Sequence, residues 1–503
     1  MSAEHVECRL GAYADSVTLM RVSADVRQAD RVQAALIAMA TELNLDMLAA
    51  MGFPPPPDAG PNHLLIAVRA SDDAALAGAL AVVDTALTAR PRAGQLVGQA
   101  QAPRTTAAAV RASGPGLALI SVPGQYAFAE AMDALEADCD VMIFSDNVPV
   151  EQEIMLKDFA AQRDLIVMGP DCGTAIVGGV GLGFSHTLAA GPVGVVAASG
   201  TGAQQVMCLL DYAGAGISAA LGVGGRDLSA AVDGRSARAA LAALDADPGT
   251  ELIVVVSKPP AAEVAAGLRD FAAGLATPVQ FALVAPGEPD LTAASETAVR
   301  TLGLPVPDWP RWRGAGQAAR PESGGFRAAH EASPPAGVLR GLFAGGTLCD
   351  EAMVIASGRL GPIRSNIPLR PELLLAPLAP ATGHAMIDFG DDELTTGRAH
   401  PMIDQSLRLE RLAAEAADPA VTVILLDVVL GHGAHADPAA ELGPAIAAAR
   451  ESGVAVVVSM IGAASDPQDL GRQAAILQAA GADVFASNAA AARFACDLIE
   501  GAR

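Results

Sequence analysis

The sequence predicts an α/β protein with several flavodoxin- or Rossmann-like parallel-sheet domains, preceded by a small α+β domain at the N-terminus. Its 503 residues are too many for one hydrophobic core. Hydrophobic residues make up 51% of the chain but aromatic residues only 3%, which is typical of helix and sheet layers packed through small aliphatic side chains. From residue 117 onward, short apolar runs alternate with helical patterns, as parallel strands with helical crossovers require.

Charge and cysteine usage restrict the function classes. The formal net charge of −24 argues against a surface for nucleic acid or for an anionic membrane. The six cysteines are scattered without a CxxC pair, which indicates a reducing compartment. We see no signal peptide and no apolar stretch long enough to span a bilayer, and we therefore expect a soluble, cytoplasmic protein.

Residues 1–101 form the predicted N-terminal α+β domain. We expect strands at Val17–Val22 and Leu64–Val68 and helices at Val32–Ala40 and Ala74–Leu87. No motif in this domain indicates a catalytic or binding function.

Residues 102–190 form the first predicted Rossmann-like domain. Strands at 117–121, 141–145 and 165–168 alternate with helices at 127–135 and 150–161, and ligands bind beyond the C-terminal ends of such strands. Asn147 and Asp171 stand at two of these ends, although Asp and Asn are also common turn residues. No GxGxxG follows the first strand, so we do not expect a nicotinamide dinucleotide.

Residues 191–307 form a flavodoxin-type domain that opens with the sequence GPVGVVAASGTG. The apolar run at 193–197 predicts a buried strand, and 204–212 predicts a helix. Between them, Ser199, Gly200, Thr201 and Gly202 leave backbone N–H groups at a helix N-terminus, where an anion can bind. The alternative is an ordinary junction in which the glycines only permit close packing.

The same domain offers two basic residues. GVGGRDLS follows the strand at 217–221, so Gly224 and Gly225 predict a close backbone approach to ligand, and Arg226 is a candidate carboxylate or phosphate clamp. The alternative for Arg226 is a salt bridge to Asp227. Lys258 ends the strand at 252–256; it is a candidate ligand-binding residue or a solvated surface lysine.

Residues 308–337, rich in Pro, Gly, Arg and Ser, read as a linker, with Trp309 and Trp312 anchoring it to a domain surface. Residues 338–503 then repeat the pattern of the preceding domain. A strand at 339–343 is followed by AGGT and a helix, and later strands are expected at 385–389, 421–426, 455–459 and 484–486.

GHGAHADP follows the strand at 421–426 and predicts a second helix start. Gly431 and Gly433 could form an anion-binding nest of backbone N–H groups. His432 and His435 could serve as hydrogen-bond donors or general acid–base groups. With Asp437 they could also ligate zinc, but the position at a helix start disfavours this and we assign no metal site.

Six segments together resemble the FdrA family, a branch of proteins similar to succinyl-CoA synthetase. They are LALISVPGQYAFAEAMDAL, VMIFSDNVPVEQEIMLKDFA, LIVMGPDCGTAI, GVVAASGTGAQQV, GVGGRDLS and ELIVVVSKPPA. The resemblance covers nearly the whole chain and implies domains of the succinyl-CoA synthetase type, with an α-subunit-like part from Leu117 to Pro307. A part like the C-terminal domain of the β subunit follows from Gly337. In the synthetases two helix N-termini face each other and cradle the phosphate of a phosphohistidine, and we expect AASGTG and GHGAHAD to correspond to them.

The sequence also departs from the synthetase pattern. Residues 261–307 contain no histidine where the phosphohistidine motif is expected, and neither an ATP-grasp domain nor the glycine-rich CoA loop is present. We therefore expect the anion cradle to persist without the phosphohistidine relay, with no required cofactor and with CoA binding left open.

The resemblance implies a function in purine and allantoin breakdown, as one subunit of an oxamate carbamoyltransferase acting with two further protein subunits in a hetero-oligomer. Carbamoyl phosphate would then be the substrate held at the cradle, with His432, His435 or Asp171 accepting the proton and Arg226 holding oxamate. The alternatives are an acid–CoA ligase or CoA transferase, and a non-catalytic subunit that binds an acyl phosphate.

Overall fold

The structure, a computed structural model, describes residues 3–10, 19, 22–23, 25–27, 29, 31–57, 59–60, 63–88, 103–114, 116–314, 337–395 and 398–501. It divides into two compact units, residues 1–102 with 390–404 and residues 103–389 with 405–503. The first division lies beside the predicted boundary at residue 101, whereas 390–404 interrupts the predicted domain at 338–503.

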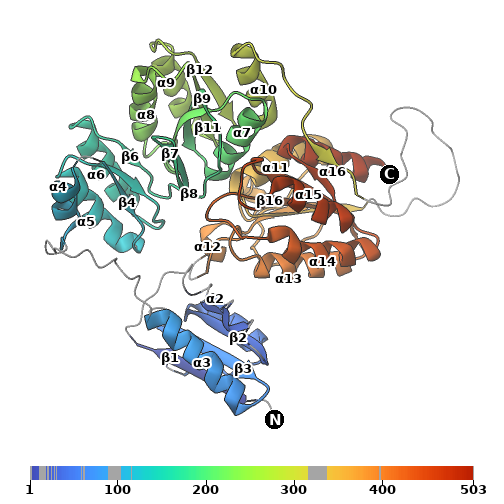
Figure 1. The fold of residues 1–503 in the computed structure, drawn as a ribbon. Helices are drawn as coiled ribbons and strands as arrows, with labels where there is room; N and C mark the ends of the chain where they lie inside the picture. The colour runs from blue at the N-terminus through green and yellow to red at the C-terminus, as the bar shows by residue number, and fades with distance from the viewer. Residues whose placement is uncertain are drawn as a thin grey trace, which may run out of the picture. The chain divides into compact units, whose positions relative to one another are not determined.

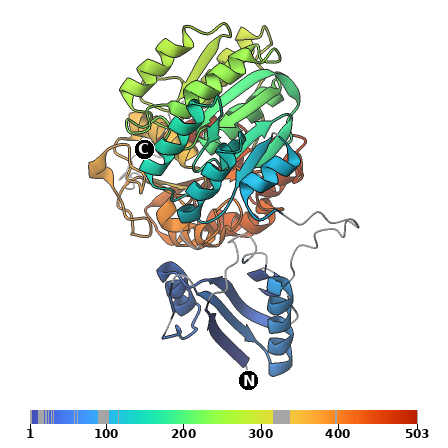
Figure 2. The same ribbon diagram turned by 90° about the vertical axis from the view of Figure 1, so that its left-hand side faces the viewer.

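The N-terminal unit is built on an antiparallel sheet in the order β1-β3-β2, with helix α3 along it (Figure 2). Its elements are β1 (Ala3–Arg9), β2 (Val32–Met39), α2 (Glu42–Ala50), β3 (Leu64–Ala70), α3 (Asp73–Thr88) and, from the inserted segment, α12 (Asp392–Thr395). The strand and helix predicted at 64–68 and 74–87 are confirmed.

Two predictions in this unit fail. The helix expected at Val32–Ala40 is wrong, because this segment is strand β2, paired with β3. Ile37 packs into one core and Leu36 and Ala38 into another, so alternate side chains serve opposite faces of the sheet. The strand expected at Val17–Val22 lies partly outside the described residues; Leu19 and Val22 are helical.

Residues 103–170 form a parallel sheet in the order β4-β5-β6 with helices packed on it (Figure 1). Its elements are α4 (Thr106–Ser113), β4 (Leu117–Ile120), α5 (Gly124–Leu135), β5 (Asp140–Ile143), α6 (Val150–Ala161) and β6 (Val167–Met168). The predicted β-α-β-α-β succession is confirmed, and its core combines Ala127 and Leu135 of α5, Leu156 of α6 and Val141 of β5.

Residues 174–301, called module 1 below, form a six-stranded sheet in the order β12-β11-β9-β10-β7-β8. Its elements are β7 (Thr174–Val177), β8 (Val180–Gly183), β9 (Ala190–Ala198), α7 (Gly200–Tyr212), β10 (Ile217–Gly222), α8 (Arg235–Ala246), β11 (Leu252–Ser257), α9 (Ala262–Ala272), β12 (Val279–Leu283) and α10 (Leu291–Thr301). The four strands from β9 to β12 are parallel in a flavodoxin-like order, while β7 and β8 add an antiparallel hairpin from upstream of the predicted boundary at residue 191.

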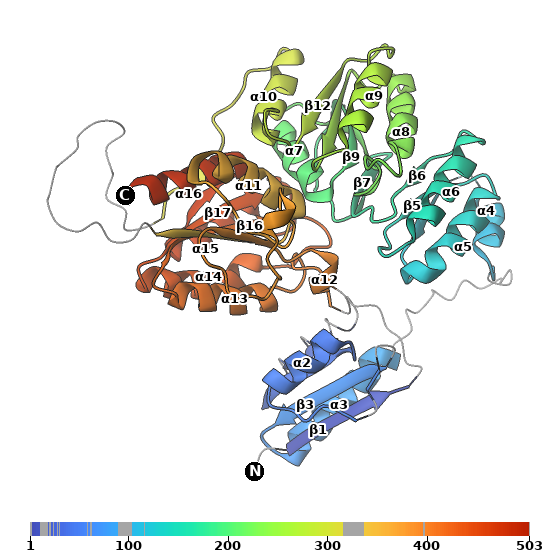
Figure 3. The ribbon, with the colours of Figure 1, turned by 180° about the vertical axis from the view of Figure 1, so that it is seen from behind.

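Residues 338–389 and 405–501, called module 2 below, repeat this order in the parallel strands β15-β14-β16-β17-β18. Figures 1 and 3 show α11 and α16 on one face of the sheet and α13 and α14 on the other. Its elements are β14 (Val338–Phe343), α11 (Gly346–Leu360), η1 (Pro371–Leu373), β15 (Ala385–Asp388), α13 (Ser406–Ala417), β16 (Val421–Val429), α14 (Pro438–Glu451), β17 (Ala455–Ile461), α15 (Leu470–Ala479), β18 (Asp483–Phe485) and α16 (Asn488–Gly501).

The tryptophans of the predicted linker contact domain surfaces, as expected. Trp309 donates from Nε1 to Glu296 Oε1 at 3.1 Å, and its ring lies 6.1 Å from that of Tyr212. Trp312 belongs to β13 (Arg311–Trp312), which pairs antiparallel with β18. In the described part of the chain, no helix combines the length and the hydropathy that a bilayer span needs.

Candidate functional site

The junction between β9 and α7 has the predicted strand–turn–helix form. Ser199 is the N-cap residue, and its Oγ accepts a hydrogen bond from Gly202 N at 3.0 Å. The strand before it is buried, whereas Gly200 at the first helical position is exposed. The N-terminus of α7 therefore opens to solvent beside a fixed N-cap.

A second helix start, that of α11 in module 2, touches this junction. Ser199 Oγ donates to Thr347 Oγ1 at 2.7 Å. Gly345 packs so closely that a Cβ atom there would lie 2.7 Å from Thr201 Oγ1. Within the described ranges, no protein acceptor is paired with the amides of Gly200, Thr201, Gly346 and Thr347. Two positive helix ends therefore meet at one place, called the α7/α11 junction below.

Charged side chains surround the module 1 side of this junction. Ser257 of β11 pairs with Ala198 of β9, so Lys258 emerges next to the N-cap of α7. A methyl group on Gly225 would lie 3.3 Å from Lys258 Nζ and 3.2 Å from Asp171 Oδ2. The structure thus brings three of the predicted residues, Asp171, Gly225 and Lys258, together at the C-terminal edge of the module 1 sheet.

Two carboxyl groups of α11 have pKa values above the usual range for a carboxylic acid. Asp350 is 7% exposed, and burial raises its pKa to about 7 against the opposing effect of Lys258. Burial also raises the pKa of Glu351 to about 7. Glu351 is bonded on both oxygens, accepting from Leu291 N at the start of α10 and from Asn488 Nδ2. Asp350 has no hydrogen-bond partner among the described residues, which leaves its carboxyl group available.

The Gly431 turn does not supply the second helix start, contrary to our prediction. Helix α14 begins only at Pro438, so Gly431 and Gly433 lie in a loop. The amide of Gly431 donates to Gln468 Oε1 at 3.0 Å, and the amide of His432 donates to Ser185 O at 2.7 Å. The amides of Gly431 and His432 are used within the protein, which contradicts the predicted anion nest at Gly431. The turn that contacts Ser199 is instead AGGT at 344–347.

The two histidines of this loop have neighbours of their own. His432 Nε2 lies 3.0 Å from Thr187 Oγ1. His435 Nδ1 accepts from Asp437 N at 3.0 Å, and its Nε2 lies 3.3 Å from Glu441. The Asp437 carboxylate bonds Arg472 and Gln473 rather than either imidazole. No group of three or more His, Cys, Asp or Glu side chains placed to hold a metal occurs among the described residues.

A set of buried polar contacts, not predicted from the sequence, joins Asp466 to α7 through His186. His186 Nδ1 lies 2.6 Å from Asp466 Oδ2, and its Nε2 lies 3.3 Å from Gln204 Nε2. Burial would raise the pKa of Asp466, but hydrogen bonds from His186, Ala463 and Thr187 outweigh it and lower that pKa. This side of the junction is therefore closed by protein. Only the pairing of residues 280 positions apart creates it, so no local pattern could reveal it.

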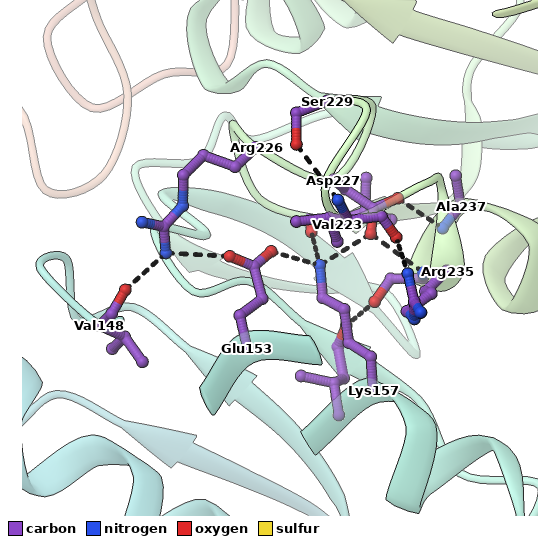
Figure 4. Close-up of polar contacts among 12 residues, drawn as sticks. Val148, Glu153, Lys157, Val223, Arg226, Asp227, Ser229, Arg235 and Ala237 are labelled. Atoms are coloured by element: carbon purple, nitrogen blue, oxygen red, sulfur yellow. Dashed lines mark hydrogen bonds and ion pairs between the residues drawn. The ribbon is translucent and has the colours of Figure 1, made fainter. Parts of the chain in front are cut away.

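Arg226 binds a partner that the sequence did not suggest. Its Nη2 donates to Val148 O at 2.7 Å and lies 2.9 Å from Glu153 Oε2, rather than pairing with Asp227 (Figure 4). The Glu153 carboxylate is fully buried, and Arg226 covers it from the solvent side. The proposed role of Arg226 as a substrate clamp would require this pair to separate.

Lys157 completes this cluster beneath Arg226. Its Nζ donates to Glu153 Oε1 and Asp227 Oδ1, both at 2.7 Å, and to Val223 O at 3.1 Å (Figure 4). Asp227 also accepts from the amides of Ser236 and Ala237 at the start of α8. All three ammonium donors are satisfied, and the charges balance, so the cluster fastens the 103–170 domain to module 1.

Gly224 and Asn147 lie at backbone contacts. A Cβ atom on Gly224 would lie 2.3 Å from Pro170 O, so this glycine packs against the turn that carries Asp171. Asn147 adopts φ +53 and packs on Gly124, the first residue of α5. Among the described residues, the Asn147 side chain has no hydrogen bond that would assign it to the α7/α11 junction.

Known proteins resemble separate parts of this chain. Residues 342–498 match the CoA-ligase family, and residues 1–104 match the family described as "AllF, heavy metal-associated domain". A succinate–CoA ligase [ADP-forming] α subunit from Aquifex aeolicus is 29% identical over 160 residues, 31% of this chain and 51% of the relative. The match thus spans about half of that subunit. A dinucleotide-forming acetyl-coenzyme A synthetase from Ca. Korarchaeum cryptofilum aligns over 77% of this chain and 83% of its own, at 15% identity and a TM-score of 0.29.

The paired flavodoxin-like modules and the CoA-ligase match define a protein of the succinyl-CoA synthetase type. The YahF protein of Escherichia coli (strain K12) is 36% identical over 95% of both chains. The chain therefore belongs to the same family as YahF, the FdrA-type branch of succinyl-CoA synthetase-like proteins.

Proposed function

We propose that this chain is an enzyme of acid–CoA ligase type that handles an acyl phosphate and binds its phosphate at the α7/α11 junction. One observation carries the proposal: the 2.7 Å contact between Ser199 and Thr347 brings together two helix N-termini with four amides that lack protein acceptors among the described residues. Lys258 adds positive charge at the same edge. Backbone N–H groups and a lysine are suited to a phosphate dianion and to the oxyanion of acyl transfer.

The chemistry follows from that placement. A nucleophile, the thiol of CoA or an amine, attacks the acyl carbon, and the carbon–oxygen bond to phosphate breaks with its electron pair going to the phosphate oxygen. The helix ends stabilise the negative charge that grows on this oxygen. CoA enters this proposal from the names of the CoA-ligase family and of the succinate–CoA ligase relatives.

Carbamoyl transfer from carbamoyl phosphate to an amine such as oxamate is the second candidate, with partner subunits required. It is favoured by the absence of histidine from residues 261–307 in the sequence. A donor that arrives already phosphorylated needs no phosphohistidine intermediate. The match of residues 1–104 to a family named AllF is consistent with a role in allantoin breakdown.

Calorimetric titration of the full chain with inorganic phosphate tests the site without partner subunits. We expect millimolar or tighter binding that Gly200→Val removes, because Gly200 is exposed at the helix start and a branched side chain there would cover the open amides. The first carbon of that side chain fits, since a Cβ atom on Gly200 would lie 3.6 Å from Thr174 Oγ1. The control is Gly358→Val, at an exposed glycine near the other end of α11, where a Cβ atom meets nothing within 4 Å. Equal phosphate binding by the wild type and Gly200→Val would contradict the proposed site.

Mass spectrometry of products then separates the two candidates. The chain is incubated with acetyl phosphate and CoA, and separately, together with its partner subunits, with carbamoyl phosphate and oxamate. Acetyl-CoA formation supports the ligase-type reaction, and a carbamoylated oxamate supports the transferase.

A further inference from the structure

Asp350 stands out among the buried charged groups because no described protein group satisfies it. It lies one turn into α11, three residues after Thr347, which touches the N-cap of α7. Its side chain is more than nine-tenths buried and has no hydrogen-bond partner among the described residues. Its carboxyl oxygens are not among the fully enclosed unpaired atoms of the described residues, so this mostly buried group still reaches solvent. A carboxyl group without a protein partner, open to solvent beside two open helix ends, points to a ligand.

We propose that Asp350 is the group that exchanges a proton with the ligand at the α7/α11 junction, and this inference rests on the proposed function. When neutral, the Asp350 carboxyl donates its O–H to the bound phosphate. When ionised, it accepts the proton of the attacking thiol or amine as the new bond to the acyl carbon forms. That proton then passes to solvent, and the phosphate leaves with the electron pair of the broken carbon–oxygen bond.

The charged groups around Asp350 and the start of α11 come from several elements. Lys258, after β11, is the positive group that acts on it. Asp388 ends β15 next to Gly346, and Asp427 of β16 bonds Gly345. On α11 itself, Cys349 is buried and Glu351 is bonded to the start of α10. Helix α7 presents no charge here, but His186 and Asp466 reach it through Gln204.

The protonation state of Asp350 changes near neutral pH, since burial raises its pKa to about 7. Below that pH the carboxyl is neutral and compatible with a bound dianion. Above it the carboxylate repels the dianion, so anion binding should weaken as the pH rises through 7. Sulfate is a suitable probe because it stays a dianion across this range.

The test is calorimetric titration of the full chain with sulfate from pH 6 to pH 8.5. We expect the wild-type dissociation constant to rise roughly tenfold over this range, and Asp350→Asn to bind sulfate with an affinity that no longer changes with pH. Glu351→Gln is the matched control: it removes the adjacent buried carboxyl, whose pKa is also about 7, and should keep the wild-type pH dependence.

Lys258→Met is a second variant that does not depend on the folding of Asp350→Asn, because Lys258 is exposed. Lys258 lowers the pKa of Asp350, so its removal should weaken sulfate binding and move the midpoint of the pH dependence upward. A pH-independent wild type, an unmoved midpoint in Lys258→Met, or a persisting pH dependence in Asp350→Asn would overturn the inference. Failure of sulfate to bind at any pH would instead overturn the proposed site itself.

Discussion

Modules 1 and 2 contain the same strand–turn–helix unit, but they differ in which groups accept hydrogen bonds from the backbone amides of its turn. In module 2, Asp427 of β16 accepts from Ala344 N at 2.7 Å and from Gly345 N at 2.8 Å. When the two modules are aligned on their N-cap residues, Ser199 and Gly345, the position of Asp427 in module 2 corresponds to Val256 of β11 in module 1. Module 2 thus holds its turn with an internal carboxylate, whereas the turn of module 1 has an aliphatic side chain at the equivalent position.

The two helices are also equivalent in how they connect the modules. Gln205 of α7 accepts from Asn488 N at the start of α16, and Glu351 of α11 accepts from Leu291 N at the start of α10. The residues just before these, Gln204 and Asp350, have different partners. Gln204 is hydrogen-bonded to the buried His186, whereas Asp350 interacts electrostatically with Lys258. One side of the pseudo-symmetric junction is therefore closed by protein, and the other carries the residues with available chemistry.

The largest expected effect comes from removing the internal carboxylate of module 2. Asp427 and Arg408 are fully buried and 2.6 Å apart; burial raises the pKa of Asp427 and lowers that of Arg408. Asp427→Asn leaves Arg408 buried without its counterion and should cost about 3–5 kcal/mol in urea unfolding. The double variant with Arg408→Met should cost less than Asp427→Asn alone. An equal or larger loss in the double variant would show that the amides, not the ion pair, need the carboxylate.

An intermediate effect is expected from a methyl group placed at the contact between the modules. Gly345→Ala would force atoms of Thr201 aside at 2.7–2.8 Å and should cost about 1–3 kcal/mol. Gly200→Ala meets Thr174 Oγ1 at an ordinary 3.6 Å and should change stability by less than about 0.5 kcal/mol. The check is the midpoint of urea unfolding for both variants. Equal midpoints would mean that the helix starts can separate freely.

The smallest effect is expected from the hydroxyl pair that joins the helices. Ser199→Ala removes both the N-cap of α7 and the bond to Thr347, and should cost about 1–2 kcal/mol. Thr347→Val removes only the acceptor, at about 0.5–1.5 kcal/mol. A double-mutant cycle by urea unfolding should give a coupling of about 0.5–1 kcal/mol. If the stability losses of the two variants are strictly additive, the Ser199 hydroxyl stabilises the protein only as the N-cap of α7.

Local sequence patterns were sufficient for most of the elements. The apolar runs and glycine turns predicted β9, β10 and β11 of module 1, the parallel strands of module 2 and the start of α7, because strand burial and helix capping depend on neighbours in the chain. They missed β12 of module 1. They misassigned β2, since eight mostly aliphatic residues satisfy a helical pattern as well as a strand buried on both faces. They also placed a helix start at Gly431, because a glycine-rich turn looks the same whether its amides are free or already bonded.

The sequence by itself therefore determined the fold class, the repeated module and the strand–turn–helix form of the Ser199 turn. Only the tertiary structure decided that the Gly345 turn is its partner, that Arg226 covers Glu153, and that Asp350 faces Lys258. These pairings join residues between about 70 and 150 positions apart. Their physical cause is the packing of separate sheets, which brings distant side chains together and fixes which polar groups are already satisfied.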